Sequence, residues 1–390
     1  MIFSAVLTMT MPAAPQPAPY AIDVILPVTG SFAYDGFTDT QTFRVFEAWA
    51  NAHGGLRGQP IRFDIHDDQS SPALSVQLLT QIAAKHPAVV LGSSSAGICN
   101  ALAPIAKDGP VLYCFSPAII PPKNGYVFAT SISVDPYINA MVRYFRLRGF
   151  HRIAIISSTD GSGIADDQST HRVLEFSEQH DVQIVDWEHF NPIDLTINAQ
   201  AANIKRSNAQ AIIVWTSGTP FGTVLRSLQD SGVDLPVMTT QANGDPTQLK
   251  QYVSFLPKDL TMPGYAYALP TALLPSQMRK PIADFYQAYK DAHVQPSVSK
   301  TGTVWDPALI VLSGLRKLGA TASATQLRDY ILSLHGFPGV DGIYDFTNGD
   351  QHGLSDKAVI LVSWNAATDT WSTRSGPGGI PLASAADVVK

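Results

Sequence analysis

Residues 337–350 read Phe337-Pro338-Gly339-Val340-Asp341-Gly342-Ile343-Tyr344-Asp345-Phe346-Thr347-Asn348-Gly349-Asp350, and they form the most informative stretch of the chain. Their glycines permit tight turns or positive φ angles, which other residues rarely adopt. Between the glycines, residues 343–346 alternate as a strand does. Asn348-Gly349 is a strong turn dipeptide. The stretch therefore predicts a short strand held between two turns.

The rest of the chain alternates strands and helices from Tyr20 onward. Strands are expected where apolar residues run together or alternate, and helices where they recur three or four positions apart. The first series has expected strands at 22–27, 61–65, 88–92 and 111–115. Between them, helices are expected to begin at Thr38 or Asp39, at Ser71-Pro72 and at Gly97. This order predicts a parallel sheet covered by helices on both faces.

A second series of strands and helices starts at Asp135-Pro136, which reads as a helix cap. Its expected strands are 152–157, 182–187, 211–215 and 236–240, with helices near 165–179, 194–205, 219–231 and 246–255. Later helices at 277–292, 303–318 and 324–334 are expected to return to the first sheet, before strands at 343–346 and 358–364. The fold class is therefore α/β, with two doubly wound lobes joined by a hinge of several segments and a ligand cleft between facing strand ends.

The length of 390 residues exceeds what one hydrophobic core usually supports and predicts two domains. We assign residues 20–133 and 269–339 to an N-terminal lobe and residues 134–268 and 340–375 to a C-terminal lobe. Residues 1–19 are expected to form a leader and residues 376–390 a tail.

The composition excludes several classes of partner. Hydrophobic residues make up 45% and charged residues 15%, which is typical of a soluble globular protein. No apolar run is long enough to span a bilayer. The net charge of −6, without a Lys/Arg-rich run, excludes an electrostatic footprint for nucleic acid. No group of His, Cys, Asp and Glu has metal-ligand spacing, so neither a metal nor another cofactor is expected.

The first residues resemble an export signal with an atypical start. Residues 1–11 are apolar and Pro12-Ala13-Ala14-Pro15 resembles a cleavage region, but no Lys or Arg precedes the apolar run. We interpret the segment as a truncated export signal and expect a periplasmic protein; a disordered cytoplasmic tail is the alternative.

Cys99 and Cys114 are the only cysteines and match no metal or redox spacing. They are expected near the start of a helix and in the following strand. A bridge is geometrically possible, but two buried free thiols are the expected state.

Motifs in a fixed order along the chain carry a resemblance to a known family. They are 26–33, 50–58, Asp67-Asp68, Gly92-Ser93-Ser94-Ser95, 126–130, Trp305-Asp306-Pro307-Ala308 and 339–350. From Ala21 to about Trp371 the chain resembles type I periplasmic binding proteins, specifically the leucine/isoleucine/valine-binding group of ABC-transporter solute receptors. The resemblance implies a monomeric receptor that binds a small molecule by closure of two lobes, with an ABC-transporter permease as partner and no catalytic residues.

In that family a ligand carboxylate is held in the N-terminal lobe by hydroxyls and backbone N–H groups. The resemblance places these on Ser93, Ser94 and Ser95, and on residues 116–118, Ser116, Pro117 and Ala118. Hydroxyls and free N–H groups at a helix start favour an anion. The alternative for the three serines is helix capping, which needs only one of them.

The C-terminal lobe departs from the family pattern. Where the family usually has a Tyr after the first strand of this lobe, residues 159–163 offer Asp160 and Ser162. The acidic residue that holds a ligand ammonium has Asp245 as its candidate, close to Asn243, although Asp245 before Pro246 is equally suited to capping a helix. Recognition of an amino group is left open.

Aromatic residues are expected around the cleft. Phe32 and Tyr34 lie in the first loop, Trp215 at a strand end, Phe221 shortly after it and Trp305 in a late helix. Walls of this kind suit a small carboxylic acid with an apolar or aromatic body, such as a hydrophobic amino acid or an aromatic acid.

Three other functions compete with that of a receptor. An α/β-hydrolase would use Ser94 as nucleophile with His335 or His352 as base, but His53-Gly54-Gly55 ends a helix instead of following a strand. A dinucleotide enzyme would need a glycine where Asp166 stands. A cytoplasmic sensor of the same fold, resembling amide sensors, is the remaining alternative.

Overall fold

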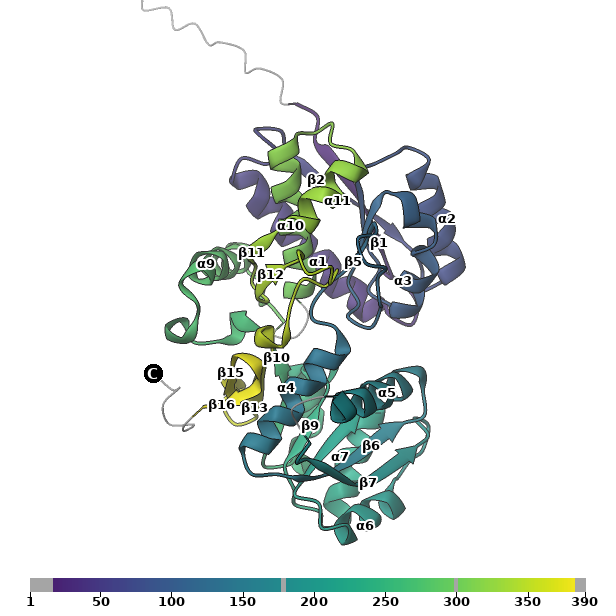
Figure 1. Cartoon of the computed structure of the whole chain (residues 1–390), viewed down its shortest axis with the longest axis vertical. Helices are drawn as coiled ribbons and strands as arrows, with labels where there is room; N and C mark the ends of the chain where they lie inside the picture. Colours follow the sequence, from purple (N-terminus) through teal and green to yellow (C-terminus); the bar gives the residue numbers. More distant parts are fainter. Residues whose placement is uncertain (1–16, 177–179, 298–300, 383–390) are drawn as a thin grey trace, which may run out of the picture.

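The computed structural model describes residues 17–176, 180–297 and 301–382, so residues 1–16 of the expected leader at 1–19 lie outside the described residues. The chain forms two α/β lobes stacked along the long axis of the molecule (Figure 1). This arrangement confirms the expected fold class.

The N-terminal lobe is built on a five-stranded parallel sheet in the order β2-β1-β3-β4-β5. Its strands are β1 (Tyr20–Leu26), β2 (Ile61–Asp67), β3 (Val89–Gly92), β4 (Val111–Cys114) and β5 (Val127–Ala129). The helices of the first series are α1 (Ala33–Ala52), α2 (Pro72–Ala83) and α3 (Ala96–Leu102). The late helices α9 (Ser276–Asp291), α10 (Gly302–Leu318) and α11 (Ala324–Leu332) pack against this lobe, as expected.

The C-terminal lobe has a seven-stranded sheet in the order β14-β13-β10-β9-β8-β6-β7. Its strands are β6 (Arg152–Ser158), β7 (Gln183–Phe190), β8 (Ala211–Trp215), β9 (Val237–Thr239), β10 (Leu260–Gly264), β13 (Ile360–Asn365) and β14 (Thr370–Thr373). Its helices are α4 (Val134–Leu147), α5 (Gly161–Phe176), α6 (Asn198–Arg206), α7 (Thr219–Asp230) and α8 (Pro246–Gln251). β13 and β14 pair antiparallel, so this sheet is mixed at one edge.

The stretch that opened the sequence analysis forms the hairpin of β11 (His335–Pro338) and β12 (Ile343–Asp345), which confirms the strand expected there. Its turn docks on α10: the Asp306 carboxylate accepts hydrogen bonds from the backbone N–H groups of Val340 and Asp341, both at 2.8 Å. A Cβ at Gly339 would overlap the Asp306 carboxylate. The glycine is therefore needed for the close approach of the turn to the helix.

Three connections of the described chain cross between the lobes. They lie between β5 and α4, between β10 and α9, and between β12 and β13. A crossing of several segments leaves the lobes free to move as bodies about a hinge.

The first helix differs from its expected start. α1 begins at Ala33 with Phe32 as N-cap and no side-chain cap, so neither Thr38 nor Asp39 caps it. Asp39 instead lies inside the helix and is buried. The correction matters because a cap residue would face solvent, whereas Asp39 faces the junction of the lobes.

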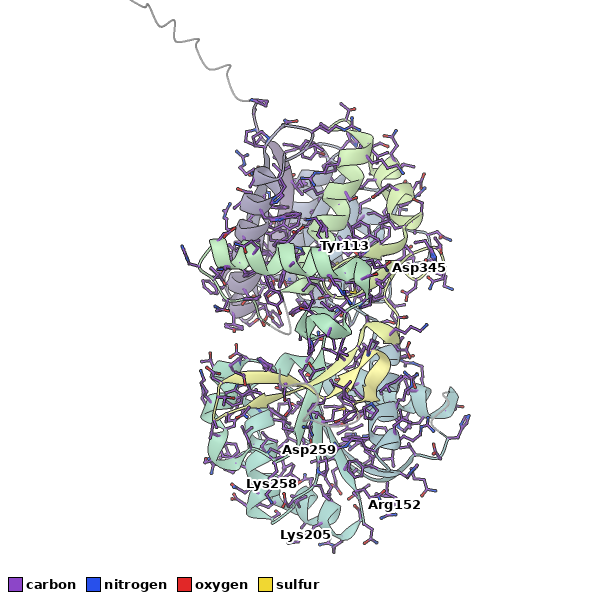
Figure 2. The ribbon with its side chains drawn as sticks, turned by 90° about the vertical axis from the view of Figure 1, so that its left-hand side faces the viewer. Tyr113, Arg152, Lys205, Lys258, Asp259 and Asp345 are labelled. Carbon is purple, nitrogen blue, oxygen red and sulfur yellow. A yellow bond between two sulfur atoms is a disulfide. The ribbon has the colours of Figure 1, made fainter. Side chains whose placement is uncertain are left out.

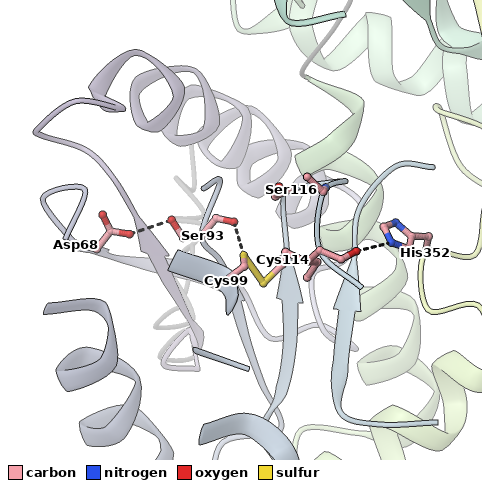
Figure 3. Close-up of a disulfide and its surroundings, with 8 residues drawn as sticks. Asp68, Ser93, Cys99, Cys114, Ser116 and His352 are labelled. Carbon is pink, nitrogen blue, oxygen red and sulfur yellow. Dashed lines mark hydrogen bonds between the residues drawn. A yellow bond between two sulfur atoms is a disulfide. The ribbon is translucent and has the colours of Figure 1, made fainter. Parts of the chain in front are cut away.

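The expectation of two free thiols is wrong, because Cys99 and Cys114 form a disulfide. The bridge joins α3 to the end of β4 (Figure 3), and both residues are fully buried. It therefore ties the loop after β3, which carries Ser93, to the loop after β4, which carries Ser116.

Candidate ligand-binding site

A cavity of about 290 Å³ lies between the lobes. The N-terminal lobe and the start of the crossing segment contribute Asp35, Asp39, Ser94, Phe115, Pro117, Ala118, Ser131, Ile132 and Thr303. The C-terminal lobe and its side of the hinge contribute Val134, Tyr137, Ser162, Asp166, Thr216, Ser217, Thr240, Gln241, Ala242 and Tyr265. Many of these residues follow the carboxyl ends of β3, β4, β6, β8 and β9, where parallel sheets bind ligands.

The cavity has three acidic residues in its wall. Asp35, Asp39 and Asp166 line it, and the described lining residues include no Lys, Arg or His. The labelled basic residues Arg152, Lys205 and Lys258 lie toward the far end of the C-terminal lobe (Figure 2). The described lining therefore offers a ligand acidic side chains but no basic ones.

Asp39 is the most buried carboxyl of the cavity, with 4% of its surface exposed. The Ser94 hydroxyl donates a hydrogen bond to it, across 55 residues of sequence. Burial raises the pKa of the Asp39 carboxyl to about 7, and the bond from Ser94 lowers that pKa only in part. A charged Asp39 is thus costly unless a cation accompanies it.

Asp166 stands on α5, in the opposite lobe. Within the described parts of the chain, no hydrogen-bond donor reaches its carboxyl group. Burial and the nearby charges of Asp167 and Asp160 raise the pKa of Asp166 to about 7. Like Asp39, it is a carboxyl whose charge the surrounding protein does not compensate.

The remaining walls are apolar and aromatic. Phe115, Pro117 and Ile132 supply apolar surface. The Tyr137 hydroxyl accepts a hydrogen bond from the Gln241 backbone N–H at 2.8 Å. The Tyr265 and Ser131 hydroxyls bond each other across the hinge. These contacts hold two tyrosine rings in place, and rigid aromatic walls suit an apolar ligand body.

The serines expected to grip a carboxylate have other partners. Ser93 is fully buried and donates to Asp68 at 2.9 Å (Figure 3), and it does not line the cavity. Ser94 lines the cavity but donates to Asp39. Ser95 is the N-cap residue of α3 without a side-chain cap bond. Ser116 accepts from the Ala118 N–H at 3.3 Å, while Pro117 and Ala118 belong to the wall.

Of the residues expected to bind ligand from the C-terminal lobe, some line the cavity and others have structural roles. Ser162 lines the cavity, and Asp160 accepts its hydroxyl at 2.8 Å and its backbone N–H at 3.1 Å. Asn243 is fully buried and donates to the Thr216 carbonyl at 2.8 Å. Of the two roles considered for Asp245, the structure gives capping: it accepts from Thr247 N–H at 2.6 Å and Gln248 N–H at 3.1 Å.

The two tryptophans do not reach the cavity. Trp215 is fully buried in the core of the C-terminal lobe, because both faces of its parallel strand are covered. Trp305 is 1% exposed and packs edge-on against Phe285 at 5.1 Å between ring centroids. Both expectations are therefore corrected. Phe221 is likewise a core residue.

Phe32 and Tyr34 are exposed loop and helix residues outside the main cavity, with 42% and 61% of their surface exposed. The Tyr34 hydroxyl donates to Asp245, which joins α1 of one lobe to the cap of α8 in the other. Tyr34 also lines a smaller neighbouring groove, whereas Phe32 lines neither cavity. This contact holds the lobes together at the rim of the cleft.

Neither of the histidines considered as a base for an α/β-hydrolase lies beside Ser94. His335 bonds Asp345 at 2.7 Å, and His352 is buried against the Ile119 carbonyl at 3.1 Å. Neither lines the cavity. The Ser94 hydroxyl faces a carboxyl of raised pKa instead.

The sequence reasoning missed Asp39, Asp166, Tyr137, Gln241 and Tyr265 as cavity residues. Asp39 would have been found had the helix been started at Ala33, the last residue of the motif at 26–33. Asp166 follows the strand-to-helix loop at residues 159–163, which offers candidate ligand contacts. Its position next to that loop could therefore have indicated a cavity residue. Tyr265 follows β10, a strand the periodicity did not reveal.

Asp39→Asn is expected to stabilise the ligand-free protein more at pH 8 than at pH 4.5. The unfolded carboxyl ionises above pH 4, while the folded one keeps its proton until about pH 7, so rising pH lowers stability across this window. Since water reaches the cavity, we expect Asp39→Asn to stabilise the protein by only about 1–2 kcal/mol more at pH 8 than at pH 4.5. Denaturant unfolding at both pH values measures it.

Asp230→Asn removes an exposed carboxyl at the end of α7 and is the control. It should leave the free energy of unfolding unchanged at both pH 4.5 and pH 8. Equal gains for Asp39→Asn at pH 4.5 and pH 8 would contradict the expected burial cost.

Comparisons with known proteins were made over the whole chain. A family model described as periplasmic binding protein matches residues 19–369. The chain is similar to a type 1 periplasmic binding protein of Bordetella pertussis Tohama I, with 20% identity, 93% and 100% of the two chains covered and a TM-score of 0.75. It is also similar to the branched-chain amino acid transporter substrate binding protein LivJ of Streptococcus pneumoniae in complex with isoleucine, with 17% identity, 92% and 99% covered and a TM-score of 0.72.

An extracellular ligand-binding receptor of Rhodopseudomonas palustris HaA2 gives 17% identity, 90% and 99% coverage and a TM-score of 0.74. No curated protein matches the chain. Across the described ranges, no helix combines the length and apolar character needed to cross a membrane. In the same ranges, no group of three or more His, Cys, Asp or Glu side chains could hold a metal ion.

Proposed function

Since the chain belongs to the periplasmic binding protein family, we propose that it is the solute receptor of an ABC importer and holds a small organic molecule between its lobes. The observation that carries this proposal is the cavity at the facing strand ends of both sheets, with apolar walls and few polar groups. Such a site buries a ligand when the lobes close. The solute would leave unchanged, through a membrane permease.

We propose that the protein acts outside the cytoplasm. The disulfide between Cys99 and Cys114 supports this location, because such bonds persist in oxidising compartments and are rare in the cytosol. The family to which the chain belongs points the same way.

The ligand is proposed to have an apolar or aromatic body, as the sequence analysis expected. We do not retain the expectation that Ser94, Ser95 and Ser116 grip its carboxylate, because the Ser94 hydroxyl already donates to Asp39, and neither Ser95 nor Ser116 lines the cavity. The LivJ structure holds isoleucine, but a likeness at 17% identity carries the fold and not the ligand.

Lobe closure gives the direct test. The purified protein is denatured, the small molecules it releases are identified by mass spectrometry, and these are added back to refolded protein. X-ray scattering should show a smaller radius of gyration with the solute than without it, because closure brings the lobes together. The solute should be recovered chemically unchanged.

Maltose, a polar sugar unsuited to apolar walls, is the control and should leave the scattering unchanged. Conversion of a stoichiometric solute into a product would refute the receptor function. The receptor function would also be refuted if none of the released molecules caused the lobes to close.

A further inference from the structure

Two carboxyl groups of the interlobe cavity come from opposite lobes, those of Asp39 and Asp166. The side-chain oxygen Oε1 of Gln241 is a further acceptor in the wall and has no donor within the described structure. Each of these three groups can accept a hydrogen bond from a solute.

Two hydroxyls beside these carboxyls are already committed as donors. Ser94 donates to Asp39, and Ser162 donates to Asp160 at 2.8 Å. Ser131 and Tyr265 are bonded to each other. The Thr216 hydroxyl, also in the wall, has no hydrogen-bond partner within the described structure. A ligand carboxylate near Asp39 and Asp166 would still meet two carboxyl groups, and like charges in a confined site repel strongly.

Asp39 is more than nine-tenths buried, and Ser94 is its only hydrogen-bond donor within the described chain. Its second carboxylate oxygen therefore has no protein donor. Asp166 has none for either oxygen. Asp39 is buried and Asp166 half-buried, and carboxyl groups withdrawn from water are ordinarily paired, so both can still take a partner.

We propose that the solute is an organic cation, an amine with an apolar or aromatic body and no carboxylate, whose ammonium group binds between Asp39 and Asp166. The inference rests on the receptor function proposed above and names its ligand class. An ammonium group supplies up to three donors and one positive charge, which matches the two carboxyls and the Gln241 oxygen. The ring or alkyl part then lies against Phe115, Ile132 and Tyr137.

Because the two carboxyls come from different lobes, the cation would also join the lobes. An ion pair to Asp39 anchors the solute on α1, and a second to Asp166 draws α5 toward it. Closure is thereby coupled to the charge of the solute. The pKa values raised by burial agree with this geometry, since a cation would hold both carboxyls ionised.

Three probes of one carbon skeleton test the ligand class: 2-phenylethylamine, phenylalanine and 3-phenylpropanoate. Titration calorimetry on the full chain at pH 7.5 should give at least roughly 10-fold tighter binding of the amine than of either other probe. Isoamylamine, leucine and isovalerate form a second, smaller set. Equal or tighter binding of the amino acids or acids, or no binding of either amine, overturns the inference.

Asp39→Asn and Asp166→Asn keep the side-chain shape and remove the charge. Each should weaken binding of the tighter amine by roughly 10- to 100-fold, since each removes one charge-assisted contact. Asp230→Asn removes an exposed carboxyl of the same lobe as Asp166 and should leave the affinity unchanged. Unchanged amine affinity in both cavity variants overturns the inference.

The same measurements separate the two proposals. If an acid or neutral solute closes the lobes, the receptor function stands and the cation inference fails. If no released solute closes them, the receptor function itself fails.

Discussion

Gly92→Ala is expected to destabilise the N-terminal lobe by about 2–5 kcal/mol and to abolish ligand binding. Gly92 ends β3 with a φ of 104°, in the left-handed region that favours glycine. A Cβ there would also overlap the carbonyl oxygen of Ile25 in the neighbouring strand β1. A positive φ costs about 1–2 kcal/mol and overpacking about 1–3 kcal/mol, and here both apply to backbone that has no rotamer to adjust.

The matched control is Gly97→Ala in α3, five residues along the chain. Its φ is not positive, and a Cβ there would meet only the Ser95 hydroxyl at 3.8 Å. Since alanine is the better helix former, stability should stay the same or rise by about 0.5–1 kcal/mol. Both variants are compared by denaturant unfolding and calorimetry; similar stability of the two would show that Gly92 tolerates a side chain.

Removal of the disulfide is expected to lower the free energy of unfolding by about 3 kcal/mol. Cys99 and Cys114 are separated by 15 residues, and closing a loop of that length restricts the unfolded chain by about this amount. The double substitution Cys99→Ala/Cys114→Ala should lower the melting temperature by roughly 5–10 °C. Differential scanning calorimetry measures the shift.

Reductant separates loss of the bridge from loss of sulfur packing. Dithiothreitol, under conditions that reduce the buried bond, should lower the melting temperature of the natural protein but leave the double variant unchanged. If the oxidised natural protein and the double variant melt together, the bridge contributes no stability.

The sequence predicted the sheets well where strands are buried on both faces. β3 and β4 read as continuous apolar runs, because helices cover both sides of a parallel sheet. The start of α1 escaped prediction because its N-cap, Phe32, makes no side-chain cap bond, so no polar residue marks it. Asp39 was read as a cap because a capping aspartate and a buried one look alike in sequence.

The place of the site was predictable from the strand ends, but its chemistry was not. Ser94, Pro117, Ala118 and Ser162 follow predicted strands and line the cavity. The partner of the Ser94 hydroxyl lies 55 residues away, and no local pattern reveals a contact of that range. Trp215 ends a strand with two covered faces, so its alternation could not show which way the ring points.

The N-terminal lobe cannot be completed on the ribosome until residue 345 has been synthesised. The lobe begins with β1 but takes α9, α10, α11 and the β11–β12 hairpin from the late part of the chain, after the whole of α4–α8. Until α10 has been made, the sheet lacks the helix that contacts α1 and β3. For a chain that is exported unfolded, this order of synthesis would delay stable folding of the first half of the chain.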